Sequence, residues 1–143
     1  PDFKPDNRKT PLILIGAGTG IGPLAGFIRD QGAQRPIHLW FGARHPDTDF
    51  LYGEDLNQWA DQGALSGLHT AFSRSGQRHY VQDALRQDAQ SLRDLIANGA
   101  KIMVCGGRDM GAGVRDAITD IMAPLGMSAA TLKSQGRYAE DVY

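Results

Sequence analysis

Short apolar runs separated by segments of helical periodicity place the strongest limit on the fold of this chain. The runs cover residues 12–15, 37–41, 68–72 and 102–105, and each has the length of one buried strand. Connections of ten or more helical residues between strands are typical of parallel sheets with helices on both faces. The pattern therefore predicts an α/β fold built on a doubly wound parallel sheet.

Apolar residues at helical spacing mark the connections. Pro23 suits the first turn of one helix and Gly63 the end of a second, and one or two helices are expected between Val81 and Ile96. The expected apolar faces are, in chain order, Leu24, Phe27 and Ile28; Tyr52, Leu56, Trp59 and Ala60; Val81, Ala84 and Leu85; Leu92, Leu95 and Ile96; and Val114, Ile118, Ile121, Met122 and Leu125.

Length and composition fit one globular domain. The chain has 143 residues, 41% of them hydrophobic, and a net charge of −1, which does not favour bulk electrostatic binding of nucleic acid. Its single cysteine cannot form an internal disulfide, as is usual in a reducing compartment, and no apolar run approaches the ~18 residues of a membrane helix. Because the chain starts at Pro1 without a methionine, we interpret it as a fragment in which residues 1–10 are a linker, 11–135 the domain and 136–143 a tail.

The loop after the first apolar run is rich in glycine. It reads Gly-Ala-Gly-Thr-Gly-Ile-Gly-Pro from Gly16 to Pro23. Glycines allow the backbone to approach an anion, and the helix that follows offers unpaired N–H groups to a phosphate. Ile21 stands where the usual dinucleotide fingerprint has glycine, and a Walker lysine is absent. The loop is a candidate phosphate site of another type, with an ordinary tight turn as the alternative.

Arginines follow the second and third runs. Arg44 stands where NAD-binding sites carry a ribose-binding acid, and the segment from Ser73 to Tyr80 contains Arg74 and Arg78. Guanidinium groups suit a phosphate monoester, and the ring of Tyr80 offers a face for adenine. Solvated surface arginines are the alternative, but three anion-friendly loops at one sheet edge favour a binding site.

Cys105 ends the fourth run, where a lone cysteine most often fills space in a core. No family signature links one of the four histidines to it as a base, and no spacing of His, Cys and Asp indicates a metal site. The chain ends on Tyr143, which suggests that this ring packs on something.

Taken together, five stretches resemble the C-terminal NADP(H)-binding domain of the ferredoxin–NADP reductase superfamily, and most closely its diflavin reductase branch. They are GAGTGIGPLAGFIRD, FGARHPDTDFLYGEDL, AFSRSGQRHYVQDAL, VCGGRDMGAGV and GRYAEDVY, in the family's order and over nearly the whole chain from Pro11 to Tyr143. The resemblance implies a Rossmann-like domain with a five-stranded doubly wound parallel sheet.

The resemblance also implies a role for individual residues. In this scheme Tyr143 stacks on a flavin ring and moves aside for the nicotinamide, which Cys105 and Asp141 flank. The other implied positions are Gly18, Thr19, Gly20 and Arg44 at the pyrophosphate; Ser73, Arg74 and Arg78 at the 2′-phosphate of NADPH; Tyr80 and Gln82 at the adenosine; and Gly106 and Met110 in the Cys-Gly-Gly-Arg-Asp-Met segment, also bound to the cofactor.

Three details depart from the family pattern. Arg78 stands where lysine is common, the spacing from Ser73-Arg74 to Tyr80 is one residue shorter than in the microsomal enzymes, and the usual Asp after Cys105-Gly106 is missing, with that segment also one residue short. These departures affect the expected contacts to adenosine and ribose.

The implied reaction is hydride transfer from NADPH to FAD. The resemblance places the FAD in an upstream domain of the same polypeptide, to which residues 1–10 would lead, and an FMN is possible elsewhere in the full-length protein. Electrons would pass to an FMN domain, a haemoprotein or a membrane chain. Nucleic acid is not an expected partner. The expected location is the cytoplasm, or the cytoplasmic face of the inner membrane.

Three alternatives belong to other classes of protein. A non-enzymatic nucleotide-binding or regulatory module of the same fold stays open as the alternative. A flavodoxin-like or receiver domain is disfavoured because a receiver needs paired acids where the first run ends in glycines. A small α/β hydrolase would need a Gly-x-Ser-x-Gly elbow, which is absent.

Overall fold

The structure, a computed structural model, describes residues 9–17, 21–31, 35–43, 65–72 and 80–142. Its strands are β1 (Leu12–Ala17), β2 (Ile37–Ala43), β3 (Gly67–Phe72), β4 (Lys101–Gly106) and β5 (Tyr138–Val142). They form one five-stranded sheet in the order β3-β2-β1-β4-β5, in which every neighbouring pair is parallel. The predicted fold class is therefore confirmed.

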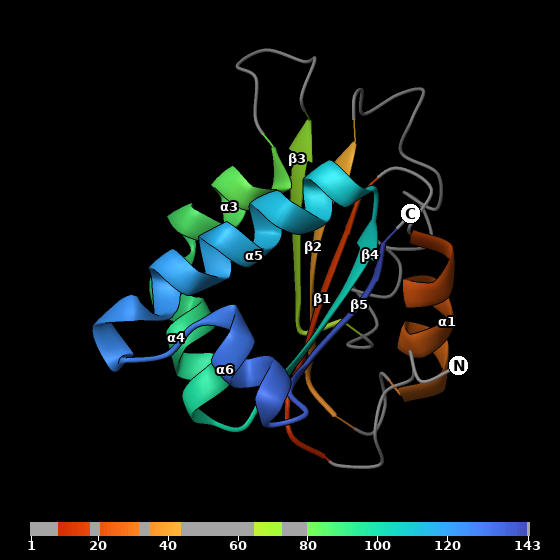
Figure 1. Ribbon diagram of the computed structural model, residues 1–143. Coiled ribbons are helices and arrows are strands. Elements are labelled where there is room, and N and C mark those ends of the chain that lie inside the picture. Colours follow the sequence, from red (N-terminus) through yellow and green to blue (C-terminus); the bar gives the residue numbers. More distant parts are fainter. Residues whose placement is uncertain (1–8, 18–20, 32–34, 44–64, 73–79, 143) are drawn as a thin grey trace.

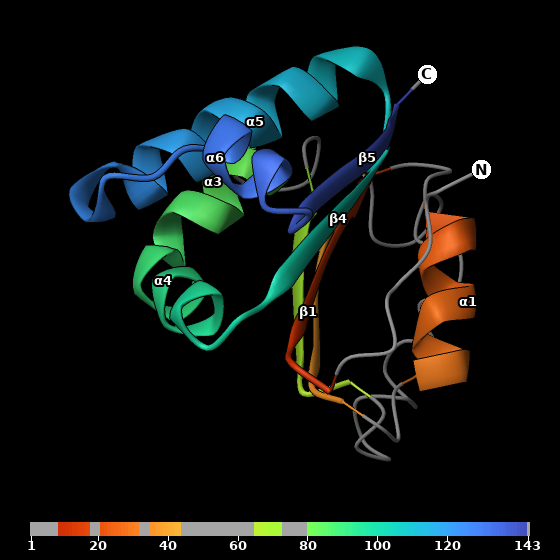
Figure 2. The same cartoon turned by 60° about the horizontal axis from the view of Figure 1, so that its bottom comes forward.

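Helices cover both faces of this sheet (Figure 1, Figure 2). Helix α1 (Ile21–Gln31) lies on one face. The opposite face carries α3 (Val81–Gln87), α4 (Ala89–Ala97), α5 (Arg108–Met122) and α6 (Ala129–Ser134), with a 3₁₀ turn, η2 (Ala123–Leu125), after α5. Among the described residues, no helix has both the length and the apolar character that crossing a membrane requires.

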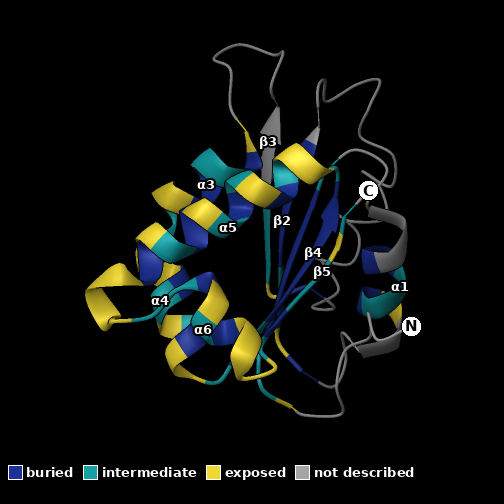
Figure 3. Cartoon of the chain, in the orientation of Figure 1, coloured by how far each residue is buried: buried dark blue, intermediate teal, exposed yellow. Residues whose placement is uncertain are grey.

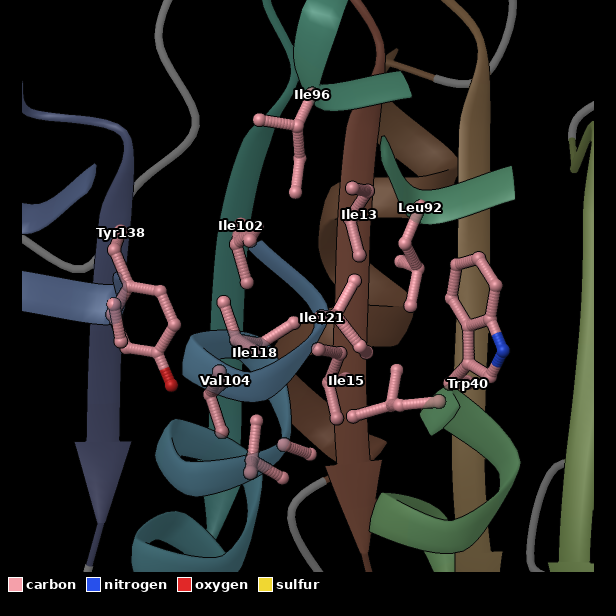
Figure 4. Packing of buried hydrophobic residues seen from close by; sticks show 14 of the residues in the cluster. Ile13, Ile15, Trp40, Leu92, Ile96, Ile102, Val104, Ile118, Ile121 and Tyr138 are labelled. Carbon is pink, nitrogen blue, oxygen red and sulfur yellow. The ribbon is translucent and has the colours of Figure 1, made fainter. Parts of the chain in front are cut away.

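Alternating strand residues divide the core into two layers. In β1, Ile13 and Ile15 pack with α3, α4, α5 and α6, whereas Leu12 and Leu14 pack with α1, and all four are fully buried. Such alternation follows from the two-residue period of a strand. Figure 3 shows the buried strands between helices whose outer surfaces are exposed, and Figure 4 shows strand side chains meeting the α4 and α5 side chains. A parallel sheet of this kind needs apolar residues on both faces, as the sequence runs predict.

The helices agree with the apolar stripes except near residue 125. The segment from Val81 to Ile96 forms two helices, which Asp88 separates. Leu125 was expected on the same stripe as Val114, but α5 ends at Met122 and Leu125 is 53% exposed. Pro124 explains this correction because proline cannot donate the next helical hydrogen bond. The expected helix with Tyr52, Leu56, Trp59 and Ala60 lies outside the described residues.

Two segments at the C-terminal side differ from the expectation drawn from the sequence. Helix α6 was not predicted, although Ser128 is its N-cap and accepts a hydrogen bond from the Thr131 N–H at 3.2 Å. The residues set apart in the sequence as a tail, 136–143, contribute the edge strand β5, so most of this segment belongs to the sheet.

Candidate functional site

The carboxyl ends of all five strands lie at one edge of the sheet, because the strands are parallel (Figure 1). From β1 the chain builds outward through β2 and β3, then returns to place β4 and β5 on the other side of β1. The strand order thus reverses between β1 and β4. In open α/β sheets, the crevice at such a reversal is where ligands bind.

Glycines near the carboxyl ends of three neighbouring strands allow helices to come close. A Cβ at Gly16 would lie 2.8 Å from Leu24 Cδ1 of α1, and one at Gly42 would lie 3.2 Å from Val81 Cβ of α3. At Gly106 a Cβ would lie 2.8 Å from Met110 Sδ of α5. Helices α1 and α5 therefore begin close to the carboxyl ends of β1 and β4. Their first N–H groups have no partner within the helix, so this edge suits anionic groups such as phosphates.

Cys105 and Asp141 lie side by side at this edge. They are register partners on β4 and β5, so both side chains belong to the same face of the sheet. That face is the one covered by α1, because Cys105 packs in the cluster that contains Leu24 and Phe41. The thiol is buried, with 2% of the residue exposed, whereas Asp141 is exposed. The sequence-predicted pair is thus brought together beside the reversal between β1 and β4.

The environment of Cys105 keeps its thiol protonated. Burial raises the pKa of this thiol, and the nearby carboxylate of Asp141 raises it further. A thiol with a raised pKa is a weak nucleophile. The described histidines do not change this, because His38 and His69 stack with Trp40, which packs in the cluster on the opposite face of the sheet. The arrangement suits a group that orients a ligand rather than one that bonds to it.

Tyr80 and Gln82 lie at the start of α3, close to the carboxyl edge. Tyr80 is 48% exposed, and its backbone N–H donates to the Asp83 carboxylate at 3.1 Å, which holds the start of the helix. Gln82 lies against α5, since a Cβ at Gly113 would be 3.1 Å from Gln82 Nε2. An exposed ring and a half-buried amide at this edge are suited to contact a planar base.

The other predicted site residues lie outside the described residues. They are Gly18, Thr19, Gly20, Arg44, Ser73, Arg74, Arg78 and Tyr143. Their segments follow directly on Ala17 of β1, Ala43 of β2, Phe72 of β3 and Val142 of β5. The roles assigned to these eight residues stay predictions.

Sequence reasoning missed a group of contacts between α5 and β5. Arg115 Nη1 donates to both carboxylate oxygens of Glu140, at 2.7 and 2.8 Å. Gly111 lies against Val142, whose Cγ1 would be 2.7 Å from a Cβ at this glycine. Glycines at 111 and 113 inside a helical stripe were a signal of close packing. The ion pair had no local signal, because its partners are 25 residues apart in the sequence.

Known proteins resemble this chain over nearly all its length. The family described as the oxidoreductase NAD-binding domain matches residues 14–116. NADPH–cytochrome P450 reductase of Homo sapiens is 41% identical over 97% of this chain. The sulfite reductase [NADPH] flavoprotein alpha-component of Shewanella oneidensis is 35% identical, and the bifunctional cytochrome P450/NADPH–P450 reductase of Bacillus cereus is 34% identical, each over 97% of this chain.

These relatives are much longer than the chain. The chain spans 23% of the human protein, 25% of the Shewanella protein and 15% of the Bacillus protein. The predicted resemblance to the diflavin reductase branch is confirmed by these matches. The chain belongs to the oxidoreductase NAD-binding domain family.

Proposed function

We propose that this chain is the NADPH-binding domain of a flavoprotein reductase and orients the nicotinamide for hydride delivery to an FAD held by another domain. The observation that carries the proposal is the pairing of Cys105 with Asp141 beside the reversal of strand order between β1 and β4. The names of the relatives support NADPH as the cofactor. NADPH, when bound, supplies the hydride, and the flavin accepts it.

The residues beside the crevice have orienting roles in this proposal. Cys105 presents a small protonated thiol, which fills space without adding charge beside the nicotinamide. Asp141 carries a negative charge, which favours the positive charge that develops on the nicotinamide ring as the hydride leaves. Neither side chain needs to form a covalent bond.

The opposite end of the cofactor would lie near the segments that follow β2 and β3. Tyr80 and Gln82 border the adenosine in this proposal, since one offers an exposed ring and the other an amide at the same edge. Arg74 and Arg78, with Ser73, read the 2′-phosphate that distinguishes NADPH from NADH. The glycines from Gly16 onward leave room for the pyrophosphate beside the start of α1.

Calorimetric titration of the chain with NADP⁺ and with NAD⁺ tests the cofactor assignment. We expect NADP⁺ to bind more tightly, with an affinity that falls as salt is added. Charge-assisted hydrogen bonds contribute about 1.5–3 kcal/mol, so Arg74→Ala should weaken NADP⁺ binding roughly 10- to 100-fold and leave NAD⁺ binding nearly unchanged. Equal losses for both nucleotides would contradict the phosphate assignment.

Flavin reduction tests the second half of the proposal. In the full-length protein, NADPH should bleach the flavin absorbance, and deleting Tyr143 should tighten NADP⁺ binding if this ring competes for the flavin face. If the protein binds the nucleotide but NADPH does not reduce the flavin, the result would instead favour a regulatory nucleotide-binding module.

The partners follow from this role. We propose that the FAD-binding domain belongs to the same polypeptide and that electrons pass onward to an FMN domain, a haemoprotein or a membrane chain. The names of the relatives, which include cytochrome P450 and sulfite reductases, support an acceptor of this kind. We also propose a cytoplasmic location, including the cytoplasmic face of the inner membrane, which cell fractionation with an antibody against this domain would test.

A further inference from the structure

Strand β5, which carries Asp141, is an edge strand of the sheet. In the described part of the chain it pairs with β4 on one side only. An edge strand has backbone hydrogen bonds to one neighbour alone, so side-chain contacts contribute more to its position. The position of Asp141 therefore depends on what fastens β5.

The two faces of β5 differ in what they contact. Tyr138 packs in the core beneath α5 and α6, Glu140 pairs with Arg115 of α5, and Val142 lies against Gly111 of α5. Figure 4 shows the Tyr138 ring directed toward the side chains of β4. Asp141 alternates with these residues and belongs to the face of its register partner Cys105. One face of the strand packs against the rest of the domain, and the other carries the exposed Asp141 beside Cys105.

The ion pair on the packed face is shielded at its carboxylate. One nitrogen of Arg115 lies 2.7 Å and 2.8 Å from the two oxygens of Glu140, and the Glu140 side chain is 17% exposed while that of Arg115 is 42% exposed. The Arg86–Asp120 pair, which also involves α5, has side chains that are 43% and 68% exposed. Shielding strengthens a charged hydrogen bond relative to an exposed one.

Two residues of β5 next to the ion pair, Tyr138 and Val142, are themselves closely packed. The hydroxyl of Tyr138 is buried without a hydrogen-bond partner among the described residues. Its pKa is raised by burial and then by the carboxylate of Glu140, while Arg115 acts in the opposite direction. Beyond the pair, Val142 fits closely against Gly111. The pair thus lies between two packed residues and directly precedes Asp141 in the strand.

We propose that the Arg115–Glu140 ion pair is a positioning device, which fastens the carboxyl end of β5 to α5 and so places Asp141 beside Cys105. The inference rests on the proposed function, because the placement of Asp141 serves the nicotinamide. Because Arg115 and Glu140 lie on the face of β5 opposite to that of Asp141 and Cys105, they act through Asp141 in this inference. Loss of the pair should therefore slow the hydride step more than it weakens nucleotide binding, since misplacement by about 1 Å can cost about 100-fold in rate.

The test uses the full-length protein with its flavin, in four forms: wild type, Glu140→Gln, Arg115→Gln and the exchanged pair Arg115→Glu/Glu140→Arg. The matched control is Arg86→Gln, which removes the exposed ion pair between Arg86 of α3 and Asp120 of α5. Two quantities are measured below the melting temperature of every form. They are the hydrogen exchange of the peptide covering residues 138–143 without NADPH, and the rate of flavin reduction at saturating NADPH together with the Kd for NADP⁺.

In Glu140→Gln and Arg115→Gln we expect exchange in this peptide to accelerate at least about 5-fold and flavin reduction to slow about 10-fold, with a Kd within about 3-fold of wild type. The exchanged pair should recover most of both losses, and Arg86→Gln should match wild type. If Arg115→Gln does not fold, the nearly isosteric Glu140→Gln decides.

Three results would overturn the inference, and they are distinguishable. Wild-type exchange and wild-type reduction rates in Glu140→Gln would show that the pair does not position β5, while the proposed function would stand. A wild-type protein whose flavin is not reduced by NADPH would overturn the proposed function, and the positioning role would fall with it. A lower melting temperature with unchanged rates would mark the pair as a purely structural tie and would also count against the inference.

Discussion

The amino ends and the carboxyl ends of the parallel strands, here called the amino edge and the carboxyl edge of the sheet, differ in their chemistry. At the amino edge, arginine side chains donate to backbone carbonyls: Arg35 Nε to Thr10 O at 2.7 Å, and Arg137 Nε to Ala100 O at 3.2 Å with a second bond to Ile96 O. At the carboxyl edge, Gly16, Gly42 and Gly106 leave room for helices, while Tyr80 and Asp141 are exposed.

This contrast separates stability from binding. Guanidinium groups at the amino edge donate to carbonyls of buried and half-buried residues, where the loss of a hydrogen bond is costly. The carboxyl edge leaves polar groups available for a ligand, and the glycines and the exposed ring there add little to the core. Substitutions at the amino edge should therefore change the free energy of unfolding, and substitutions at the carboxyl edge should change nucleotide affinity.

The largest effect is expected at Arg137. Arg137→Met keeps much of the apolar stem but removes the side-chain donor to the Ala100 carbonyl and the second of two donors to the Ile96 carbonyl, which also accepts from the Gly99 N–H at 3.0 Å. An unsatisfied carbonyl costs about 1–3 kcal/mol and a lost hydrogen bond about 0.5–1.5 kcal/mol, so we expect the free energy of unfolding to fall by about 2–4 kcal/mol. Urea denaturation followed by circular dichroism measures this loss.

The same variant should bind NADP⁺ with wild-type affinity at temperatures where it is folded. Arg86→Gln serves as the reference for an exposed arginine, and its free energy of unfolding should stay within about 0.5 kcal/mol of wild type. A large loss of NADP⁺ affinity in folded Arg137→Met would break the proposed separation of the two edges.

At Tyr80 we expect a smaller effect, and we expect it on nucleotide affinity rather than on the free energy of unfolding. Because its side chain is 48% exposed and the Asp83 cap uses only its backbone N–H, Tyr80→Ala should change the free energy of unfolding by less than about 0.5 kcal/mol. Stacking on a base contributes about 1–3 kcal/mol, so NADP⁺ affinity should fall roughly 5- to 100-fold. Calorimetry measures the affinity, and Tyr80→Phe, which keeps the ring, should bind like wild type. Wild-type affinity in Tyr80→Ala would remove this ring from the adenosine site.

The smallest effects are expected from pH, and they differ in sign between the two edges. Burial, and then the charge of His69, lower the pKa of His38, which is the second residue of β2. The unfolded chain therefore takes up this proton first, so the contribution of His38 to stability is present above pH 6.5, its unfolded value, and is lost as pH falls through the lower folded pKa.

At the carboxyl edge, the raised pKa of Cys105 acts in the alkaline range. Its contribution is present below pH 9.0, the unfolded value, and is lost as pH rises through the higher folded pKa. We expect His38→Gln to flatten the acid side of the stability profile and Cys105→Ala to flatten the alkaline side. Urea denaturation from pH 5 to pH 10 measures both, and unchanged slopes in either variant would contradict the assignment for that group.

Much of the fold could be predicted because its signals are local. Four apolar runs became β1 to β4, and the stripe from Val114 to Met122 became α5. Elements with weak local signals were missed or misplaced. Helix α6 has six residues and a cap formed by Ser128 and Thr131 rather than the Ser/Thr…Glu/Gln pattern, and the break after Met122 depends on Pro124.

The candidate site divides in the same way. Cys105, Asp141, Tyr80 and Gln82 were proposed from motifs, and the structure brings the first pair together on adjacent strands. The Arg115–Glu140 contact could not be proposed, because it joins residues of α5 and β5 that are distant in the sequence. No local sequence pattern indicates which charged side chains will form an ion pair across the fold.

The chain sequence alone therefore specifies the strands, the glycine-rich and arginine-rich segments that follow them, and the family resemblance, since each depends on near neighbours in the chain. The fold assigns the faces: Cys105 with Asp141 on the side of α1, and Glu140 with Arg115 on the side of α5. The physical reason is that strand alternation establishes which residues share a face, whereas the packing of helices across the whole sheet decides which face that is.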